Sequence, residues 1–235
     1  MSSVISARNT LLKERVPHIY SMLLSFALSI LIPSISFANP PSAEDTISEL
    51  FWGSLYKQGG TTFYCQKTFS KKTPLITAGY IYPHGDIRQH LGCGTKRQCL
   101  KNSEEYNRIA SDLHNLVPSD SYFEMKRTNT IFGVLDDQIE ANECGIKHKM
   151  HIIEPPERIR GDIARVIFYM HETYNLPLIG GPAVLESWSE MDPPSEEEIA
   201  RHNEIEKLQG KTNPLVISPN MPLSGRSAME ISSIN

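Results

Sequence analysis

The chain has 235 residues, a length suited to one domain of ordinary size once any leader is removed. It carries 23 Lys and Arg against 27 Asp and Glu, a formal net charge of −4 at pH 7. This acidic balance argues against strong nonspecific binding to a polyanion but does not exclude a local basic groove. The sequence also lacks a Gly-x-Ser-x-Gly elbow, a phosphate-binding glycine loop and a His-Glu-x-x-His motif, and so offers little support for the catalytic classes that use them.

The N-terminus has the pattern of a secretory signal peptide. Three basic residues among the first fifteen precede an apolar run over residues 22–32, which Pro33 closes, and a small-residue stretch follows at 36–38. The apolar run is too short to span a membrane comfortably, so we favour cleavage after Ala38 over a membrane anchor. The mature chain, residues 39–235, would carry a net charge of −6. We therefore expect a periplasmic or secreted protein that is not held in the membrane.

All four cysteines, Cys65, Cys93, Cys99 and Cys144, lie in the exported part of the chain. An even number of cysteines in an exported protein favours disulfides over free thiols. The sequence allows three pairings, and we favour Cys93 with Cys99 as a local loop and Cys65 with Cys144 as a staple between distant segments. A zinc site that combines Cys93 and Cys99 with nearby histidines is the less favoured alternative, because the spacing is wide for a zinc knuckle.

The first half of the mature chain is expected to hold one helix and two strands. Residues 42–45 resemble a capped helix start, and apolar residues at helical spacing continue this helix to the Gly59-Gly60 pair. Residues 61–65 and 74–82 are β-rich and are expected to form strands. Residues 85–102 are rich in Gly, Cys, Lys and Arg, and we expect a loop there.

The second half is expected to be mainly helical. Apolar spacing predicts helices over residues 103–116, 160–174 and 196–208. Residues 215–235 show no periodicity, which predicts a disordered tail. Long helices combined with few, short strands indicate an α+β fold.

Several short motifs follow one another along residues 51–214. The two longest are Asp112-Leu113-His114-Asn115-Leu116-Val117-Pro118 and Glu154-Pro155-Pro156-Glu157-Arg158-Ile159-Arg160-Gly161-Asp162. Shorter ones are Phe63-Tyr64-Cys65, Ala78-Gly79-Tyr80, Arg97-Gln98-Cys99-Leu100, Phe168-Tyr169-Met170 and Gln209-Gly210-Lys211-Thr212-Asn213-Pro214. In this order they resemble the motifs of the bacterial endonuclease I family, the periplasmic and secreted metal-dependent nucleases. Each motif alone is weak, but five or six in the right order argue against chance.

The resemblance implies a specific fold and chemistry. It implies a mainly helical single domain over residues 39–214, stapled by disulfides, around a small ββα-metal nuclease core of the His-Me finger type. In such a core a histidine activates the attacking water, one Mg²⁺ (or Mn²⁺ or Ca²⁺) stabilises the reacting phosphate, and a basic side chain contacts that phosphate. The implied substrate is DNA, with RNA as a second candidate, and we expect a monomer.

The family's adjacent Glu-His pair, which supplies one metal ligand and the base, is absent from this chain. Counting back from the Arg97-Gln98-Cys99 motif makes Gln89-His90 the best replacement, with His90 as catalytic base and Gln89 as metal ligand. A second register, Pro83-His84, keeps a histidine but no ligand. In a third interpretation the hairpin has shrunk and both histidines are ordinary loop residues.

The family's second metal ligand is an asparagine, and counting forward from His114-Asn115 places Glu124 at that position. A carboxylate is a suitable ligand for Mg²⁺ or Ca²⁺. We therefore hypothesise that Gln89 and Glu124 have exchanged neutral and charged roles. The alternative is a solvated glutamate on a site that has decayed. Arg127 and Asn129 match the end of the family's run at this position.

The remaining candidate residues are basic or supporting. Phosphate contacts are expected from Lys96, Arg97 and Lys101 on one side and from Arg127 on the other. Supporting roles are expected for His114, Asn115 and Asn129. We expect an exported endonuclease with a variant site; the alternative is an inactive module of the nuclease fold that binds nucleic acid or a protein partner.

Overall fold

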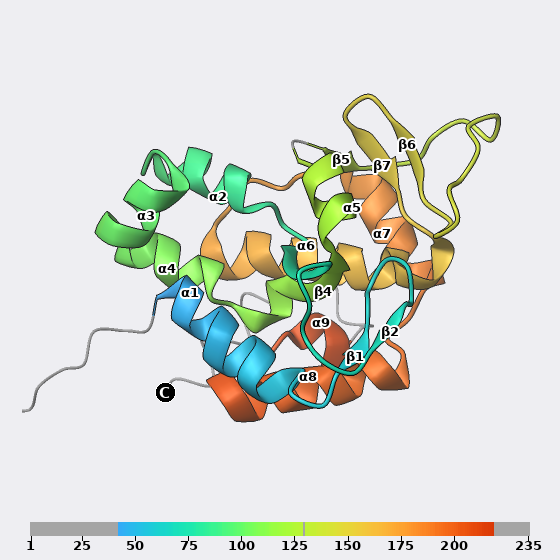
Figure 1. Cartoon of the computed structure of the whole chain (residues 1–235). Coiled ribbons are helices and arrows are strands. Elements are labelled where there is room, and N and C mark those ends of the chain that lie inside the picture. The colour runs from blue at the N-terminus through green and yellow to red at the C-terminus, as the bar shows by residue number, and fades with distance from the viewer. Residues whose placement is uncertain (1–41, 129, 219–235) are drawn as a thin grey trace, which may run out of the picture. The chain divides into compact units, whose positions relative to one another are not determined.

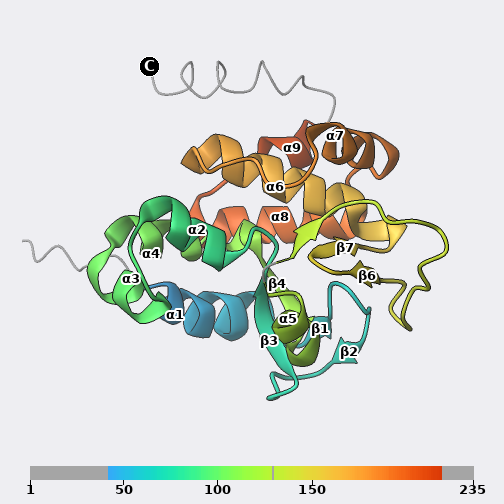
Figure 2. The same ribbon diagram turned by 90° about the horizontal axis from the view of Figure 1, so that it is seen from above.

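The computed structural model describes residues 42–128 and 130–218 (Figures 1 and 2). The predicted signal peptide, Asn129 and most of the predicted tail lie outside these residues. The first part of that tail is folded, because α9 covers Pro214–Ile217 and buries Leu215 and Val216. No helix in the described part of the chain is both long and apolar enough to cross a membrane.

The first helix begins as the sequence predicts. The Ser42 hydroxyl accepts a hydrogen bond from the Asp45 amide at 3.2 Å, and the Asp45 carboxylate accepts one from the Ser42 amide at 3.1 Å. This reciprocal capping satisfies amides that a helix start leaves without partners. The helix runs as α1 (Ala43–Thr46) and continues with π-type bonding as η1 (Ile47–Leu55).

The central strands form an antiparallel pair with a helix directly behind it. β3 (Ile76–Tyr80) pairs with β4 (Leu116–Asp120), with Gly79 opposite Val117. α5 (Ser121–Lys126) follows β4 without a loop and packs against both strands (Figure 2). Asp120 begins α5, because its carboxylate accepts hydrogen bonds from the amides of Tyr122 and Phe123 at 3.0 and 3.1 Å.

Elsewhere the strands are short. β1 (Gly60–Thr61) and β2 (Thr68–Phe69) pair with each other, so only Thr61 of the predicted 61–65 strand lies in a strand, and residues 63–65 form a turn. A three-stranded sheet has β7 (Ile152–Glu154) at its centre. β5 (Ile131–Phe132) lies parallel to β7, and β6 (Lys147–Lys149) lies antiparallel to it.

Three helices separate β3 from β4, so the predicted loop over 85–102 is wrong. α2 (His84–Leu91) and α3 (Lys96–Asn102) each bury an apolar side chain, Ile87 and Cys99. The glycines there end α2 and form a short turn, since Gly92 and Gly94 have φ values of 59° and 92°. α4 (Glu104–Ala110) and the 3₁₀ turn η2 (Leu113–Asn115) follow, so the predicted 103–116 helix ends early.

The core is built around α6 (Arg160–Tyr174), which buries ten of its residues. α6 follows the 3₁₀ turn η3 (Glu157–Ile159) and packs against α7 (Pro182–Met191) and α9 (Figure 2). α8 (Glu196–Gln209) is joined to α6 through the fully buried Arg165, whose guanidinium bonds the Glu198 carboxylate at 2.5 and 2.9 Å. The predicted helices over 160–174 and 196–208 are confirmed.

Both predicted disulfides are confirmed. Cys65 is bonded to Cys144 across 79 positions of the chain, and Cys93 is bonded to Cys99 between α2 and α3. With its many helices and small sheets, the described part has the α+β fold that the sequence indicates.

Candidate active site

A small pocket of about 110 Å³ lies between the start of α2 and α5. We call it the His84 pocket. One side of the pocket is lined by side chains of β3 and α2, namely Tyr80, His84, Asp86 and Arg88. The other side is lined by side chains of α5 and the turn after it, namely Glu124, Arg127 and Thr128.

His84 is held at this place by the segment before it. The Asn115 side chain accepts a hydrogen bond from the Tyr82 amide at 2.6 Å and donates one to the Tyr82 carbonyl at 3.0 Å. The Tyr82 hydroxyl donates to the Pro177 carbonyl at 2.8 Å. Asn115 therefore extends the pairing of β3 toward α2; the supporting role predicted for it stays a prediction. The His84 ring meets the Tyr80 ring edge to face at 5.3 Å.

Glu124 reaches the pocket because β3 has no side chain at Gly79. A Cβ built on Gly79 would lie 2.4 Å from Oε1 of Glu124, far inside contact distance. The other carboxylate oxygen, Oε2, accepts a hydrogen bond from Nε of Arg127 at 3.0 Å. Arg127 is itself 6% exposed and lies against the rings of Tyr64 and Phe132. One oxygen of Glu124 is thus fixed by a buried arginine, and the other, Oε1, lies against Gly79 without a hydrogen-bond partner among the described residues.

Buried polar atoms without partners are concentrated here. In the described part of the chain, five buried side-chain atoms lack a hydrogen-bond partner. Three of them, Nδ1 of His84, Nε of Arg88 and Oε1 of Glu124, belong to residues that line the pocket. The other two belong to Tyr64, which packs on Arg127, and to Ser119, whose side chain adjoins Gly79. Because an unpaired buried polar group costs about 1–3 kcal/mol, such a concentration is typical of a binding site.

Burial and nearby cations set the protonation of the pocket. Burial lowers the pKa of His84 below its ordinary value, and the guanidinium of Arg88 and the ammonium of Lys96 lower it further. The imidazole is therefore neutral at pH 7. Burial raises the pKa of Asp86, while the positive charge of Arg127 opposes this rise.

The structure does not bring the predicted Gln89 and His90 into this pocket. Both are exposed on α2, and His90 follows His84 by six residues, which turns it to another face of the helix. Counting back from Arg97 could not reveal this, because it treated residues 85–102 as an extended loop. The histidine that lies near Glu124 is His84, the second register considered from the sequence.

Of the four predicted phosphate contacts, only Arg127 lines the pocket. Lys96, Arg97 and Lys101 are exposed on α3, and Nζ of Lys96 lies 3.7 Å from a carboxylate oxygen of Glu44. Two pocket residues, Asp86 and Arg88, were missed. The signal for Arg88 was its spacing from His84, because on a helix a residue four positions later lies on the same face. Asp86, two positions after His84, had no such spacing signal.

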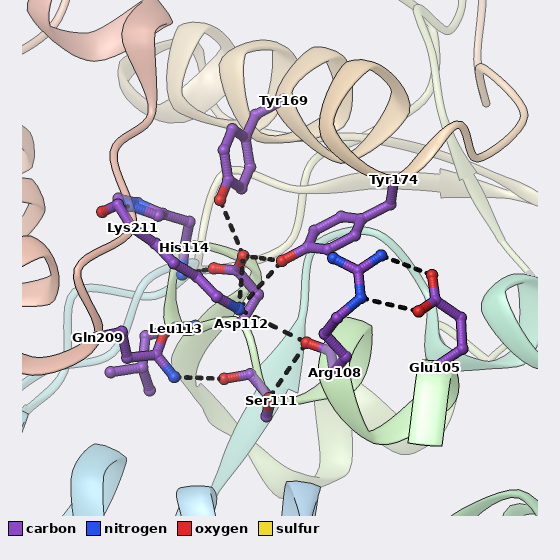
Figure 3. Close-up of polar contacts among 10 residues, drawn as sticks. All are labelled: Glu105, Arg108, Ser111, Asp112, Leu113, His114, Tyr169, Tyr174, Gln209 and Lys211. Carbon is purple, nitrogen blue, oxygen red and sulfur yellow. Dashed lines mark hydrogen bonds and ion pairs between the residues drawn. The ribbon is translucent and has the colours of Figure 1, made fainter. Parts of the chain in front are cut away.

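A second polar group of residues, which we call the Asp112 cluster, is buried beneath α6. Oδ2 of Asp112 accepts hydrogen bonds from the hydroxyls of Tyr169, at 2.8 Å, and Tyr174, and lies 3.2 Å from Nζ of Lys211 (Figure 3). Oδ1 accepts from the amide of His114 at 2.9 Å. Burial opposes ionisation of Asp112, but the positive charge of Lys211 and these hydrogen bonds hold its pKa below its ordinary value.

His114 belongs to this second cluster rather than to the pocket. Its ring Nε2 lies 3.0 Å from the Lys211 carbonyl, which a neutral imidazole can satisfy as a donor. Burial lowers the pKa of His114 to about 4, although the charge of Asp112 opposes the shift. This contact joins η2 to the segment after α8; the supporting role of His114 stays a prediction.

Comparison with known proteins identifies the family. Residues 56–180, more than half of the chain, match the family model Endonuclease I. The chain is 35% identical over 127 residues to Endonuclease-1 of Buchnera aphidicola subsp. Acyrthosiphon pisum (strain APS), covering 52% of this chain and 50% of that protein. It is 33% identical over 147 residues to an extracellular deoxyribonuclease of Aeromonas hydrophila, covering 58% and 63%.

A periplasmic deoxyribonuclease of Aeromonas hydrophila is 31% identical over 163 residues, covering 65% of this chain and 68% of that protein. The matches thus span from half to about two thirds of the length of these three relatives. The family model agrees with the order of motifs read from the sequence. The chain belongs to the endonuclease I family.

Proposed function

We propose that this protein is an exported endonuclease that hydrolyses phosphodiester bonds in DNA at the His84 pocket, with the help of a divalent cation. The observation that carries the proposal is the set of unpaired buried atoms on His84, Arg88 and Glu124. These atoms offer a base, a cation and an anionic oxygen to one small space. A phosphodiester and a hydrated metal ion together have the complementary groups.

In this proposal His84 is the general base. A neutral imidazole is the form that accepts a proton, and burial together with Arg88 favours that form. Its Nδ1 has no partner to compete for its lone pair. Asn115 and Tyr80 hold the ring in place, so little rearrangement is needed when water and phosphate enter.

Glu124 and Asp86 are the proposed holders of the cation. In the described residues no three His, Cys, Asp or Glu side chains converge closely enough to bind a metal ion by themselves. Mg²⁺ commonly uses only one or two carboxylates and completes its coordination with water and substrate phosphate, so this donor set fits it. When bound, such an ion would stabilise the negative charge on the reacting phosphate and on the leaving oxygen. Asp86, rather than Gln89, would then accompany Glu124, and Mn²⁺ or Ca²⁺ are alternative occupants.

The local architecture supports the proposal of a ββα-metal core. β3 and β4 are antiparallel, α5 follows directly, the proposed base lies after the first strand, and the proposed ligand lies on the helix. Export to the periplasm or the medium is supported by the two disulfides and by the relatives named as extracellular and periplasmic deoxyribonucleases. Action on RNA and a monomeric state stay predictions.

The test is nicking of supercoiled plasmid by the oxidised, exported protein with Mg²⁺, Mn²⁺ or EDTA. We expect cutting that EDTA abolishes, and a loss of at least about 100-fold in Glu124→Gln, which keeps the size of the side chain but removes its charge. Glu140→Gln, which changes an exposed carboxylate outside the pocket, is the matched control and should cut normally. Folded protein that fails to cut DNA with any of these metals would instead favour the inactive, binding-only module.

A further inference from the structure

Arg88 is the pocket residue whose role is not yet explained. It follows His84 by four residues on α2, and both side chains line the pocket. We propose that the Arg88 guanidinium binds the phosphate of the substrate directly, beside the water that His84 activates. This inference rests on the proposed function of the pocket, and it assigns a phosphate contact that the basic residues of α3 do not provide.

Arg88 is incompletely paired. Its Nε is buried and has no hydrogen-bond partner, and its one hydrogen bond within the described residues runs from Nη1 to the Gly94 carbonyl at 3.3 Å. No salt bridge joins it to a carboxylate in that part of the chain. Arginine has five N–H donors in a planar fork, and such a fork matches two oxygens of a phosphate. A buried donor without a partner is unfavourable, and an anion bound from outside the protein would supply the missing acceptor.

Arg88 contrasts with Arg127, the other arginine of the pocket. Arg127 is neutralised by Glu124 at 3.0 Å and is enclosed by two aromatic rings. Moving it toward a ligand would leave Glu124 as a buried carboxylate without its partner, which is unfavourable. Arg88 has no such ion pair with a carboxylate in the described part of the chain. Of the two, it is therefore the guanidinium that is available to a phosphate.

The side chain of Arg88 is directed toward the site. Side chains on a helix lean toward its N-terminus, and a Cβ built on Gly85 would lie 3.8 Å from Nη2 of Arg88. The guanidinium therefore lies back over the first turn of α2, where His84 begins the helix. The carbonyl that anchors its other nitrogen belongs to Gly94, in the turn that the Cys93–Cys99 disulfide closes. Helix and disulfide together fix the direction of this side chain.

The experiment compares Arg88→Gln and Arg88→Lys with Arg108→Gln. Arg108 is the matched control, because it is an exposed arginine on α4 that pairs with Glu105 and does not line the pocket. For cleavage of a short DNA duplex we expect kcat/KM to fall about 100-fold in Arg88→Gln, the effect of losing one donor to a reacting oxyanion. Arg88→Lys, which keeps the charge but not the fork, should lie between this variant and wild type. Arg108→Gln should stay within about twofold of wild type.

A second readout does not depend on cleavage. In the His84→Ala background, binding of the same labelled duplex in EDTA is measured by fluorescence anisotropy against salt concentration. Loss of one phosphate contact should reduce the slope of log K against log salt by about 0.9 in Arg88→Gln, while Arg108→Gln leaves the slope unchanged. Inorganic phosphate should compete with the duplex less effectively in Arg88→Gln, which separates a phosphate site from general attraction to DNA.

The outcomes are distinct. If wild type cuts and Arg88→Gln equals it in kcat/KM and in salt slope, the role of Arg88 is wrong while the proposed function stands. If wild type does not cut, the proposed function fails, and the salt slope alone decides whether Arg88 binds phosphate. If thermal unfolding shows that Arg88→Gln does not fold, Arg88→Lys decides. The proposal would be overturned if Arg88→Lys equals wild type in activity, in salt slope and in competition by inorganic phosphate.

Discussion

The His84 pocket and the Asp112 cluster are both rich in polar side chains, but they differ in how completely the buried polar atoms are hydrogen-bonded. In the Asp112 cluster each oxygen of the buried carboxylate has partners: Tyr169, Tyr174 and Lys211 on one side and the His114 amide on the other (Figure 3). In the His84 pocket three buried atoms have none. A satisfied network stabilises the fold, whereas unsatisfied atoms weaken it unless a ligand completes them.

The difference separates residues that serve folding from residues that serve chemistry. His84 and His114 are both substantially buried, and burial lowers the pKa of both. The ring of His114 is hydrogen-bonded to the Lys211 carbonyl, whereas the buried Nδ1 of His84 has no partner within the described residues. Loss of a cluster residue should therefore reduce stability, while loss of a pocket residue should reduce activity at nearly unchanged stability.

The largest effect is expected for His84→Ala. Removing the general base should lower kcat by about 100- to 10,000-fold. The free energy of unfolding should stay within about 1 kcal/mol of wild type, because the buried Nδ1 has no hydrogen bond that the substitution would break. His90→Ala, on the same helix but exposed, is the control and should keep full activity. Initial rates on a short duplex and urea unfolding measure the two quantities. Equal activity in both variants would contradict the choice of base.

Asp112→Ala should show the opposite pattern. It removes the acceptor shared by two tyrosine hydroxyls and leaves the Lys211 ammonium partly buried without its anion, so we expect a loss of about 3 kcal/mol in unfolding free energy. Tyr174→Phe deletes one donor only and should cost about 1 kcal/mol. Urea unfolding followed by circular dichroism gives both values. At temperatures where the variants are folded, kcat should change by less than about threefold; a much larger loss would place the cluster in the catalytic machinery.

The cluster also predicts a dependence of stability on pH. The folded pKa of His114 is about 4, below the ordinary value of 6.5, so between these values the unfolded chain binds more protons. The contribution of His114 to the free energy of unfolding is therefore fully present above pH 6.5. It is lost as the pH falls toward 4, by about 3 kcal/mol in total. The pKa of Asp112 is lowered from 3.8, so its contribution is lost only in more acidic solution.

The contribution of His114 is isolated by the difference between wild type and His114→Gln. Asp162, whose pKa burial and the charge of Glu198 raise to about 8, works in the opposite direction but is common to both proteins. The difference in unfolding free energy between the two proteins should change by up to about 3 kcal/mol from pH 7 to pH 4.5. A constant difference over this range would mean that the pKa of His114 is the same in the folded and the unfolded protein.

The smallest effect is expected for Gly79→Ala. Its Cβ would meet Oε1 of Glu124 at 2.4 Å, so the carboxylate must move, and we expect about a tenfold loss of activity with a higher requirement for Mg²⁺. Gly181→Ala is the control, since the added Cβ there would lie 3.6 Å from Val184, an ordinary contact. Rates measured across a Mg²⁺ series distinguish the two. Unchanged metal dependence in Gly79→Ala would show that Glu124 is not a ligand.

Much of the fold could be predicted because its signals are local. The capping box at Ser42, the apolar face of α6 and the even number of cysteines each depend on a few neighbouring residues, and all three predictions are confirmed. The motif order likewise predicted the family. The helices over 85–102 were missed because Gly92, Cys93 and Gly94 make the whole segment look like a loop, although they occupy only the turn between α2 and α3.

The site was predicted only in part, because its geometry depends on contacts between distant segments. Glu124 and Arg127 could be found by counting along the chain, since no irregular segment lies between them and Asn115. His84 could not be chosen over His90 without knowing that α2 begins at residue 84. The place of Glu124 against Gly79, across the β3–β4 pair, is invisible in the sequence. Asp86 and Arg88 became candidates only once the helix was seen.

The central claim is that the unpaired atoms of the His84 pocket are reserved for a metal ion and a phosphate. The most direct test is the thermal unfolding midpoint of wild type and Glu124→Gln over a range of Mn²⁺ concentrations with a short duplex present, both in the His84→Ala background to prevent cleavage. A ligand that binds only the folded protein raises the midpoint by an amount that grows with the logarithm of its concentration relative to Kd. We predict a midpoint that rises with Mn²⁺ for the protein with Glu124 intact and a much smaller rise for Glu124→Gln. Equal shifts in the two proteins, or none in either, would contradict the account.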